Sequence, residues 1–223
     1  MDKVVSFTWF RTNCPRNRPT EYYTRHWDKL FEVFPKVYPG WKMQWHVAGS
    51  LLKDLEDYLL LPYVNVMIMC PPQTMEEGHL WRTMPCWNPQ VEWCAQNDCD
   101  AVPCPRVAQA RQEAIEGNYD AHVVRDSPDH SGQMLAGLCM WHCPKVRSLY
   151  GSWEEFLGTE PLHDEWQYNQ WRLRDRIWDK LERTLTHLGN GAERGEQDRE
   201  IRVLRLTNDP LDDLIPIAGG GMD

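Results

Sequence analysis

The hydrophobic pattern at the start of the chain switches between the periods of strands and helices. Val4 to Phe10 is a run of β-branched and aromatic residues, which predicts a buried parallel strand. A helix is predicted from Thr20, its candidate N-cap, because Tyr23, Trp27, Leu30, Phe31 and Phe34 recur at helical spacing. Lys42 to Ala48 and Val64 to Met69 predict two further strands around a short helix capped by Ser50. This strand–helix alternation predicts a parallel sheet with right-handed crossovers.

The pattern continues in the second part of the chain with polar residues at the ends of apolar runs. The predicted strands are Val91 to the Asp98–Asp100 turn, Ala121 to Arg125, Gln133 to Trp141 and a last, edge strand at Ile201 to Leu206. The predicted helices are Pro105 to Gly117, Ser152 to Leu157 and Asp164 to Thr184. The fold class expected is α/β, with a Rossmann-like, mostly parallel sheet flanked by helices in a single domain.

A chain of 223 residues is long enough for one domain with a substantial core. No obvious linker divides it before the C-terminal region, so one domain is expected. We expect residues 1–188 to form the domain. Residues 189–223 are expected to supply a charged, glycine-containing loop, the possible edge strand and a flexible tail.

Composition narrows the function classes. With 24 basic and 33 acidic residues the net charge is −9, which argues against a general phosphate-backbone binder and disfavours, without excluding, a nucleic-acid acceptor. No apolar run is long enough for a membrane span, and the N-terminus lacks the pattern of a signal peptide, so a cytoplasmic location is expected. The 8 cysteines lack zinc-ribbon spacing and are interpreted as reduced thiols.

The pair Asp98 and Asp100 is the strongest chemical signal. Carboxylates at i and i+2 after a strand can turn toward one hard cation, which can then hold the oxygens of a diphosphate. The alternative is a solvated turn, since Asp-x-Asp is common by chance. Neither G-x-G-x-x-G nor G-x-x-x-x-G-K-[ST] occurs, so a metal would have to neutralise the phosphates instead.

Three segments of the chain form a recognisable combination. They are a first strand, a Tyr-bearing helix and Tyr38-Pro39-Gly40-Trp41; Asn97-Asp98-Cys99-Asp100 with Arg106 downstream; and His122-Val123-Val124-Arg125-Asp126-Ser127-Pro128-Asp129-His130-Ser131 followed by Ala136-Gly137. Together they resemble a poorly characterised group of bacterial and viral glycosyltransferases with the GT-A fold. The resemblance covers roughly residues 4–188. This chain departs from the family pattern at Asn97, where the family has Arg, and at Ala136, where it has Gly.

The resemblance implies a metal-dependent glycosyltransferase that moves a sugar from a nucleoside-diphosphate-sugar, UDP-sugar favoured, to a hydroxyl acceptor such as a glycan or small molecule. Asp98, Asp100 and His187 are then expected to bind Mn²⁺ or Mg²⁺. For His187 the alternative is the end of a helix, where the dipole favours a cation. The residues expected to contact the donor are Phe7, Arg11, Tyr23, Arg82, Arg106, Arg125 and Gly137.

The acceptor side is expected to depend on a carboxylate. Asp164 is the first candidate for a general base and Asp126 the second. Either could be an ion-pair partner instead, of Arg172 or Arg125, and Arg125 and Arg106 could equally form internal ion pairs. Two other function classes stay open: a metal-dependent nucleotidyl- or phosphotransferase, and a catalytically degenerate binding protein.

Overall fold

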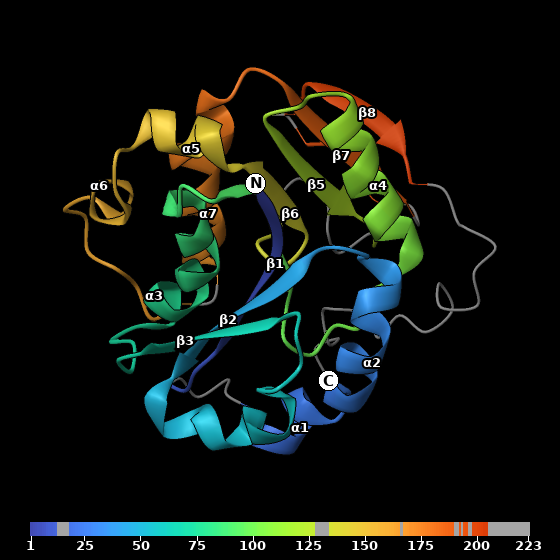
Figure 1. Cartoon of the computed structure of the whole chain (residues 1–223). Helices are drawn as coiled ribbons and strands as arrows, with labels where there is room; N and C mark the ends of the chain where they lie inside the picture. The colour runs from blue at the N-terminus through green and yellow to red at the C-terminus, as the bar shows by residue number, and fades with distance from the viewer. Residues whose placement is uncertain are drawn as a thin grey trace.

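A computed structural model describes residues 1–12, 18–127, 134–165, 167–189, 192, 194–195 and 198–204. Within these residues eight strands form one sheet in the order β3-β2-β1-β4-β6-β5-β7-β8 (Figure 1). The strands are β1 (Asp2–Trp9), β2 (Lys42–Ala48), β3 (Val64–Met69), β4 (Val91–Gln96), β5 (Ala121–Arg125), β6 (Cys139–His142), β7 (Thr184–Leu188) and β8 (Glu200–Val203).

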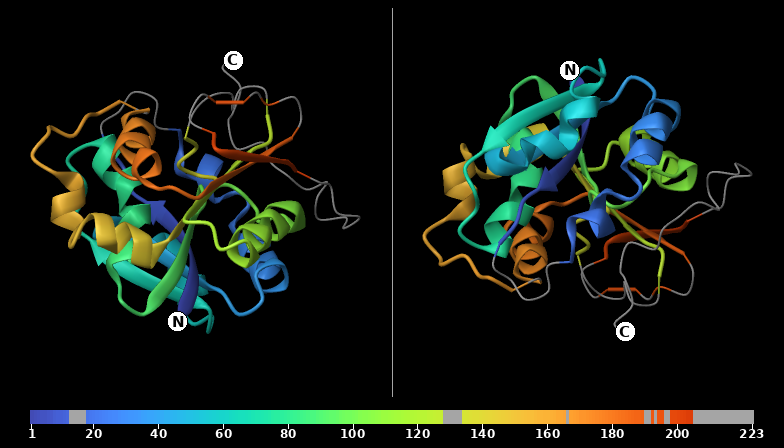
Figure 2. Two further views of the ribbon diagram at one scale, coloured as in Figure 1. Left: turned by 90° about the horizontal axis from the view of Figure 1, so that it is seen from above. Right: turned by 90° about the horizontal axis from the view of Figure 1, so that it is seen from below.

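The helices cover both faces of this sheet. The α-helices are α1 (Thr20–Thr24), α2 (Trp27–Val37), α3 (Met75–Leu80), α4 (Pro105–Glu116), α5 (Cys143–Leu149), α6 (Trp153–Leu157) and α7 (Tyr168–Arg176), and the 3₁₀ segments include η1 (Gly49–Tyr58), η2 (Trp81–Trp87) and η4 (Trp178–Lys180). Figure 2 shows α2 and α4 together on one side and α3, α5, α6 and α7 on the other.

The directions of the strands bring the turns after β4 and β5, which carry Asp98, Asp100 and Asp126, to one edge of the sheet. β1, β2, β3 and β4 are mutually parallel, and β5, β7 and β8 are parallel to one another. β6 is antiparallel to both β4 and β5, so β5 runs in the same direction as β4. The carboxyl ends of β1, β4 and β5 therefore lie at the same edge, where ligands bind in open α/β sheets.

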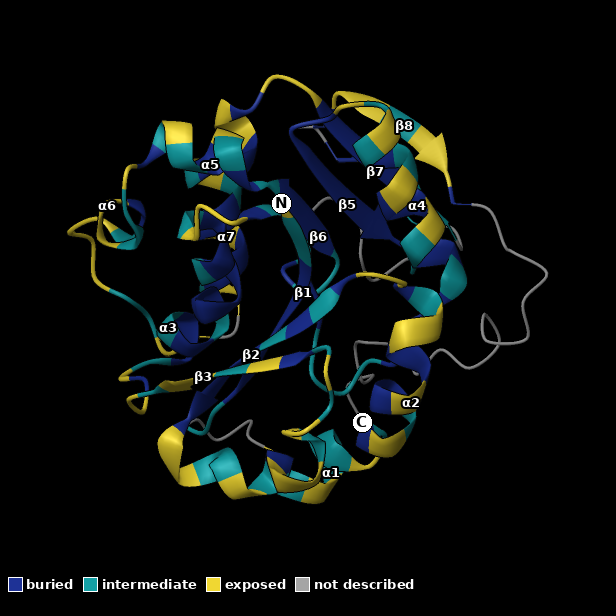
Figure 3. Ribbon diagram, viewed as in Figure 1, coloured by how far each residue is buried: buried dark blue, intermediate teal, exposed yellow. Residues whose placement is uncertain are grey.

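The core has two apolar layers because adjacent residues of β1 point to opposite faces. Val5 packs with Trp27 and Trp45 on the side of α2, whereas Val4 packs with Trp141 on the side of α5, α6 and α7. All five side chains are buried. Figure 3 shows that β5, in the middle of the sheet, is buried as well. Burying an aliphatic or aromatic side chain of this kind contributes about 1.5–3 kcal/mol, so these layers fix the sheet that carries the site.

Two sequence predictions are wrong in detail. The helix expected from Thr20 is two helices, and Thr20 is not its cap, because its hydroxyl accepts from Arg11 Nη2 at 2.5 Å. The long helix expected over Asp164 to Thr184 ends far earlier, and Thr184–Leu188 is strand β7, buried between β5 and β8. The alternation of Thr with Leu in Thr-Leu-Thr-His-Leu suits a strand with two packed faces.

Other expectations agree with the structure. The mostly parallel sheet flanked by helices is confirmed. The strand expected at Ile201 to Leu206 is found as the edge strand β8, and 205–206 lie outside the described residues. No helix in the described part of the chain is long and apolar enough to cross a bilayer.

Candidate active site at the carboxyl end of β4

Asn97 fixes the direction in which the chain leaves β4. It is buried, and its backbone N–H donates to the carbonyl of Ser6 on β1 at 3.1 Å. Its side-chain Oδ1 accepts from Arg111 Nη2 at 2.8 Å, and the same nitrogen donates to the carbonyl of Gln96 at 2.9 Å. The departure at Asn97 from the family pattern therefore provides an acceptor for a buried arginine of α4.

Asp98 lies between an arginine and a glycine. Arg82 of η2 is 3% exposed and donates to the Asp98 carboxylate and, at 3.3 Å, to the carbonyl of Asn97. Gly137, in the segment before β6, approaches so closely that a Cβ there would lie 2.3 Å from Asp98 Oδ2. The structure thus brings together Arg82, Asp98 and Gly137, which the sequence analysis named separately as donor contacts and a metal ligand; these roles stay predictions.

Asp100 has a raised pKa because of its surroundings. The turn that carries it is held by a bond from Trp27 Nε1 to the carbonyl of Cys99 at 2.9 Å. Burial, reinforced by the charge of Asp98, raises the pKa of Asp100 to about 6, while Arg25 and Arg82 act in the opposite direction. Asp98 and Asp100 therefore repel each other at a site that a cation would stabilise.

Arginine and aromatic side chains form the rim next to Asp100. The Arg11 guanidinium lies 5.4 Å from the ring centre of Trp9 and 5.7 Å from that of Tyr23. The Tyr23 hydroxyl accepts from the backbone N–H of Arg18 at 3.3 Å. Burial raises the pKa of Tyr23, and the charge of Asp100 adds to this effect, so Tyr23 lies on the Asp100 side of the site.

His79 belongs to this neighbourhood and was not predicted. Its ring packs edge-on against Phe10, which follows β1, with centroids 5.2 Å apart. Burial, with a contribution from the Arg82 charge, lowers the pKa of His79 to about 3, while Asp98 raises it slightly. Among the described residues its Nδ1 has no hydrogen-bond partner. The position of His79 depends on helix α3, which the sequence analysis did not predict. A single histidine after Gly78 belongs to no periodic pattern that could have revealed it.

Arg106 and Asp126 meet at the same edge of the sheet. Arg106 is in the first turn of α4, Asp126 follows β5, and Arg106 Nη2 lies 3.5 Å from Asp126 Oδ2. Asp126 thus has an ion-pair partner, although a different arginine from the neighbour weighed in the sequence. The next residues of the resembling segment, 128–133 with Asp129 and His130, lie outside the described residues.

Two residues that were predicted to contact the donor, Phe7 and Arg125, have buried side chains with partners inside the protein. Phe7 is 0% exposed and stacks on Trp45, with centroids 4.7 Å apart, so its ring belongs to the core. Arg125 is buried and pairs with Asp198, whose carboxylate also accepts from Thr186 Oγ1 at 2.8 Å. Of the two interpretations of Arg125, the internal ion pair is the one observed.

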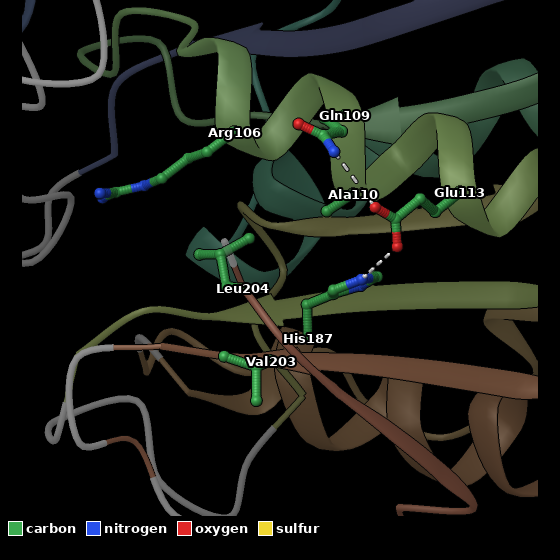
Figure 4. A pocket seen from close by; sticks show the side chains of 7 residues that line it. All are labelled: Arg106, Gln109, Ala110, Glu113, His187, Val203 and Leu204. Carbon is green, nitrogen blue, oxygen red and sulfur yellow. Dashed lines mark hydrogen bonds and ion pairs between the residues drawn. The ribbon is translucent and has the colours of Figure 1, made fainter. Parts of the chain in front are cut away.

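His187 is not joined to the two aspartates. It lies on β7, where its Nε2 is 3.2 Å from Glu113 Oε2 of α4 (Figure 4). Its Nδ1 is 2.8 Å from His122 Nε2. Burial lowers the pKa of both histidines, which favours neutral rings. A carboxylate only accepts, so His187 donates from Nε2 and accepts at Nδ1, which leaves no lone pair for a metal. Its assignment as a metal ligand and the helix-end alternative are both wrong.

Asp164 occupies a different helix terminus from the one expected. It is exposed, and its Oδ1 accepts from the backbone N–H of Met75, the first residue of α3, at 2.9 Å. Arg172 does not pair with it, because that guanidinium binds Glu76 at 2.5 Å. At about 1.5 Å rise per residue, His79 is roughly one helical turn beyond the end that Asp164 caps.

Asp98 and Asp100 could bind a hard cation as a pair, without a third protein ligand. Among the described residues no three His, Cys, Asp or Glu side chains are placed to hold a metal together. Mg²⁺ is nevertheless commonly bound by one or two carboxylates, with phosphate oxygens and water completing the shell. The Asp98 side chain is 43% exposed, and so a ligand can reach it. Asp98 and Asp100 offer oxygen donors of the right kind for Mg²⁺ or Mn²⁺.

Comparison with known proteins gives a likeness of fold. No protein-family model and no curated protein sequence matches the chain. Among solved structures, 4-diphosphocytidyl-2C-methyl-D-erythritol synthase from Anaerococcus prevotii DSM 20548 superimposes with a TM-score of 0.53 at 9% identity, covering 90% of this chain and 92% of that one. Staphylococcus aureus TarS 1-349 in complex with UDP-GlcNAc gives 0.52 at 10% identity, covering 92% of this chain but only 59% of that one. The bifunctional IspDF of Campylobacter jejuni gives 0.52 at 9% identity, with 89% and 52% covered. The chain therefore has the α/β fold of the GT-A type shared with these proteins.

Proposed function

We propose that this protein is a glycosyltransferase that uses a nucleoside-diphosphate-sugar donor and a divalent cation, Mn²⁺ or Mg²⁺, held by Asp98 and Asp100. One observation carries the proposal: the two carboxylates lie together after β4, close enough for the charge of Asp98 to raise the pKa of Asp100, with Arg82 and Arg25 nearby. The TarS structure of similar fold contains UDP-GlcNAc, which supports a UDP-sugar as the donor.

The cation, when bound, supplies Lewis-acid stabilisation of the charge that develops on the departing diphosphate. The residues of the chain position the two carboxylates and the donor. Arg82 holds the Asp98 carboxylate against the Gly137 backbone, and Arg111 holds Asn97 immediately before it. Arg11 and Tyr23 line the rim next to Asp100, where they can contact the nucleotide. Arg25 adds positive charge on the same side and can interact with a phosphate.

Glycosyl transfer breaks the bond between the sugar carbon C1 and the diphosphate oxygen and forms a bond from C1 to the acceptor oxygen. The acceptor hydroxyl proton must leave, and a carboxylate is suited to accept it in an inverting reaction. Asp164 is the first candidate because it is exposed and lies next to Met75, at the start of α3. Asp126 is the second candidate, but its pairing with Arg106 makes it less available.

Nucleotidyl transfer is the second candidate function, and the comparisons favour it in one respect. The diphosphocytidyl synthase is matched over 92% of its length, whereas the TarS chain is matched over 59%. This reaction would form a bond from an acceptor oxygen to the α-phosphorus of a nucleoside triphosphate, break the anhydride between the α- and β-phosphates and release pyrophosphate. The same two carboxylates and cation could serve it.

The products separate these functions. Purified protein with Mn²⁺ is incubated with a panel of UDP-sugars and, in parallel, with the four nucleoside triphosphates, each with a mixture of hydroxyl acceptors. Release of UDP that requires Asp100 supports glycosyl transfer, and release of pyrophosphate with the same requirement replaces it with nucleotidyl transfer. Metal-dependent UDP binding without either product would indicate a binding protein. Asp175→Asn is the matched control, because Asp175 is an exposed partner of Arg174 outside the site.

A further inference from the structure

Trp171 of α7 differs from the other tryptophans that the structure describes. It is 38% exposed, whereas each of the others is buried or only partly exposed. Its ring meets the ring of Tyr168 edge-on, with centroids 4.9 Å apart, and Tyr168 stacks on His163 with centroids 3.8 Å apart. His163 and Tyr168 are themselves partly exposed. His163, Tyr168 and Trp171 therefore form one aromatic surface that solvent reaches, which we call the aromatic platform.

The aromatic platform is held in place from α3. The backbone N–H of His163 donates to Glu76 Oε2 at 2.8 Å, and the carbonyl of His163 accepts from the backbone N–H of Glu76 at 3.1 Å. Arg172, the neighbour of Trp171 on α7, binds the other oxygen of the same buried carboxylate. Glu76 thus ties both ends of the platform to α3, and Figure 1 shows α7 beside this helix.

The platform continues into the acceptor side of the proposed active site. Asp164, the first candidate for the general base, follows His163 directly in the chain. Its exposed carboxylate accepts from the N–H of Met75 and has lone pairs left for a ligand. Within the described residues, the hydroxyl of Tyr168 and the indole N–H of Trp171 make no hydrogen bond. A ligand on the platform would therefore meet ring faces, two polar groups of the rings and a carboxylate.

Charge selects among the compounds that could bind there. The exposed ionisable side chains of residues 161–173 are the carboxylates of Asp164 and Glu165. Arg172, in the same stretch, has a side chain that is only 6% exposed and is engaged in an ion pair. Two exposed carboxylates repel a phosphate or another anion, so this surface suits a neutral ligand. The anionic diphosphate of the donor is instead expected on the side where Arg25 supplies positive charge.

We propose that the aromatic platform binds a neutral saccharide, which is the acceptor of the reaction. A pyranose ring packs its apolar C–H face on an aromatic ring, while its hydroxyl groups donate to carboxylates. A quaternary ammonium ion also binds aromatic rings, but in cages where several ring faces converge. Here His163 covers one face of Tyr168, which leaves a flat surface at Trp171.

The role of the saccharide as the acceptor rests on the proposed glycosyl transfer. One of its hydroxyl oxygens would form the bond to C1 of the donor sugar, and the bond from C1 to the diphosphate oxygen would break. The hydroxyl proton would pass to Asp164, which stands next to the platform. Trp171 and Tyr168 then act as positioning residues that hold the sugar ring.

Saturation-transfer difference NMR of the full chain tests binding without donor, metal or turnover. The probes are the methyl glycosides of glucose, galactose, mannose and N-acetylglucosamine, with lactose and cellobiose. Each is used at about 10 mM, because a ligand that stacks on one ring is expected to have a dissociation constant on the order of 1–10 mM. We expect saturation of the ring C–H protons of at least one probe.

Variants locate the contact. Trp171→Ala and Tyr168→Ala should each weaken saccharide binding by about 10-fold or more, and Trp171→Phe, which keeps a ring, should weaken it less. Leu60→Ala is the matched control, because Leu60 is a 96% exposed apolar residue outside the site, and it should change nothing. The melting temperature of each variant verifies that it folds. In a transfer assay, Trp171→Ala should raise KM for the saccharide and leave KM for the nucleotide sugar unchanged.

The outcomes separate this inference from the proposed function. No saturation of any probe, or saturation that Trp171→Ala leaves unchanged, overturns the saccharide site. Binding of tetramethylammonium at Trp171 in place of the saccharides also overturns it, because the platform then serves a cation. Mn²⁺-dependent release of UDP from UDP-sugars to water tests the proposed function without the platform. UDP release without saccharide binding overturns this inference alone, whereas saccharide binding at Trp171 without consumption of any nucleotide sugar overturns the acceptor role and the proposed function.

Discussion

The pH dependence of Mn²⁺ binding tests the proposed metal site most directly. Burial and the charge of Asp98 raise the pKa of Asp100 from 3.8 to about 6. With that value, about 97% of Asp100 is ionised at pH 7.5 but only about 9% at pH 5. A carboxylate must lose its proton to bind a metal, so the apparent affinity for Mn²⁺ should fall about 10-fold between these pH values. An aspartate with the ordinary pKa would still be about 94% ionised at pH 5 and would give almost no change.

Electron paramagnetic resonance of free Mn²⁺ measures this affinity without a nucleotide, whose phosphates could titrate in the same range. Asp100→Asn should weaken binding and remove the pH dependence. Asp98→Asn should weaken binding and move the midpoint to lower pH, because the charge that raises the pKa of Asp100 is gone. His79 does not interfere, since its pKa of about 3 lies below the range. An affinity that varies less than about 2-fold from pH 5 to 7.5 would refute the reasoning about Asp100.

Four further predictions follow from particular contacts. Gly137→Ala should lower Mn²⁺ affinity by about 10- to 100-fold in titrations, because a Cβ would meet the Asp98 carboxylate at 2.3 Å. Phe7→Ala should lower the free energy of unfolding by about 3–5 kcal/mol in urea titrations and leave Mn²⁺ affinity unchanged, because Phe7 is a core residue. Asp164→Asn should lower single-turnover sugar transfer by roughly 10²-fold while donor affinity and melting temperature stay nearly the same. Stability should fall by about 3 kcal/mol between pH 7 and pH 4 through His46 alone, whose pKa burial lowers to about 4.

The sign of the last prediction follows from proton binding. The unfolded imidazole of His46 takes up its proton near pH 6.5 and the folded one near pH 4, so the stabilisation is complete above pH 6.5 and is lost as the pH falls toward 4. His79 acts in the same direction, and Asp100 opposes them between about pH 4 and 6. A His46→Gln variant with an unchanged pH profile would contradict the assignment. For Asp164→Asn, the amide oxygen can still accept from Met75, so a large loss of stability would indicate a structural role instead.

The sequence pattern was most informative where one period dominates. β1, β2 and β3 were predicted from apolar runs, and α4 from Pro105 and the Gly117 stop, and all lie close to their predicted positions. β7 was missed because Thr184–Leu188 follows directly on a helical pattern, and only pairing with β5 and β8 decides its conformation. Long-range pairing of this kind leaves no local signal in five residues.

The candidate site was predicted in part for the same reason. Asp98 follows β4 and Gly137 precedes β6, two strands that the sequence did reveal, whereas Arg82 reaches Asp98 from the 3₁₀ segment η2, which the sequence did not reveal. Phe7 and Arg125 were misassigned because burial depends on what covers a strand, and neither Trp45 nor Asp198 is near its partner in the sequence. His79 could not be placed, since its position requires the short helix α3, which has too few residues for a periodic pattern.

The antiparallel strand β6 has a consequence for the order in which the chain can become active. β6 lies between β4 and β5, so the sheet made by the first four strands cannot join β5 until residues Cys139–His142 have left the ribosome. Asp98 belongs to the first half, Gly137 to the segment leading into β6, and Asp126 to the second half. A nascent chain that stops before β6 therefore exposes an unpaired β4 edge and keeps Asp98 and Asp100, but it lacks the Gly137 backbone against which the Asp98 carboxylate of the proposed metal site lies. Acquisition of Mn²⁺ affinity should then report the joining of the two halves, and coincide with the protection of β4 rather than with the earlier folding of β1, β2 and β3.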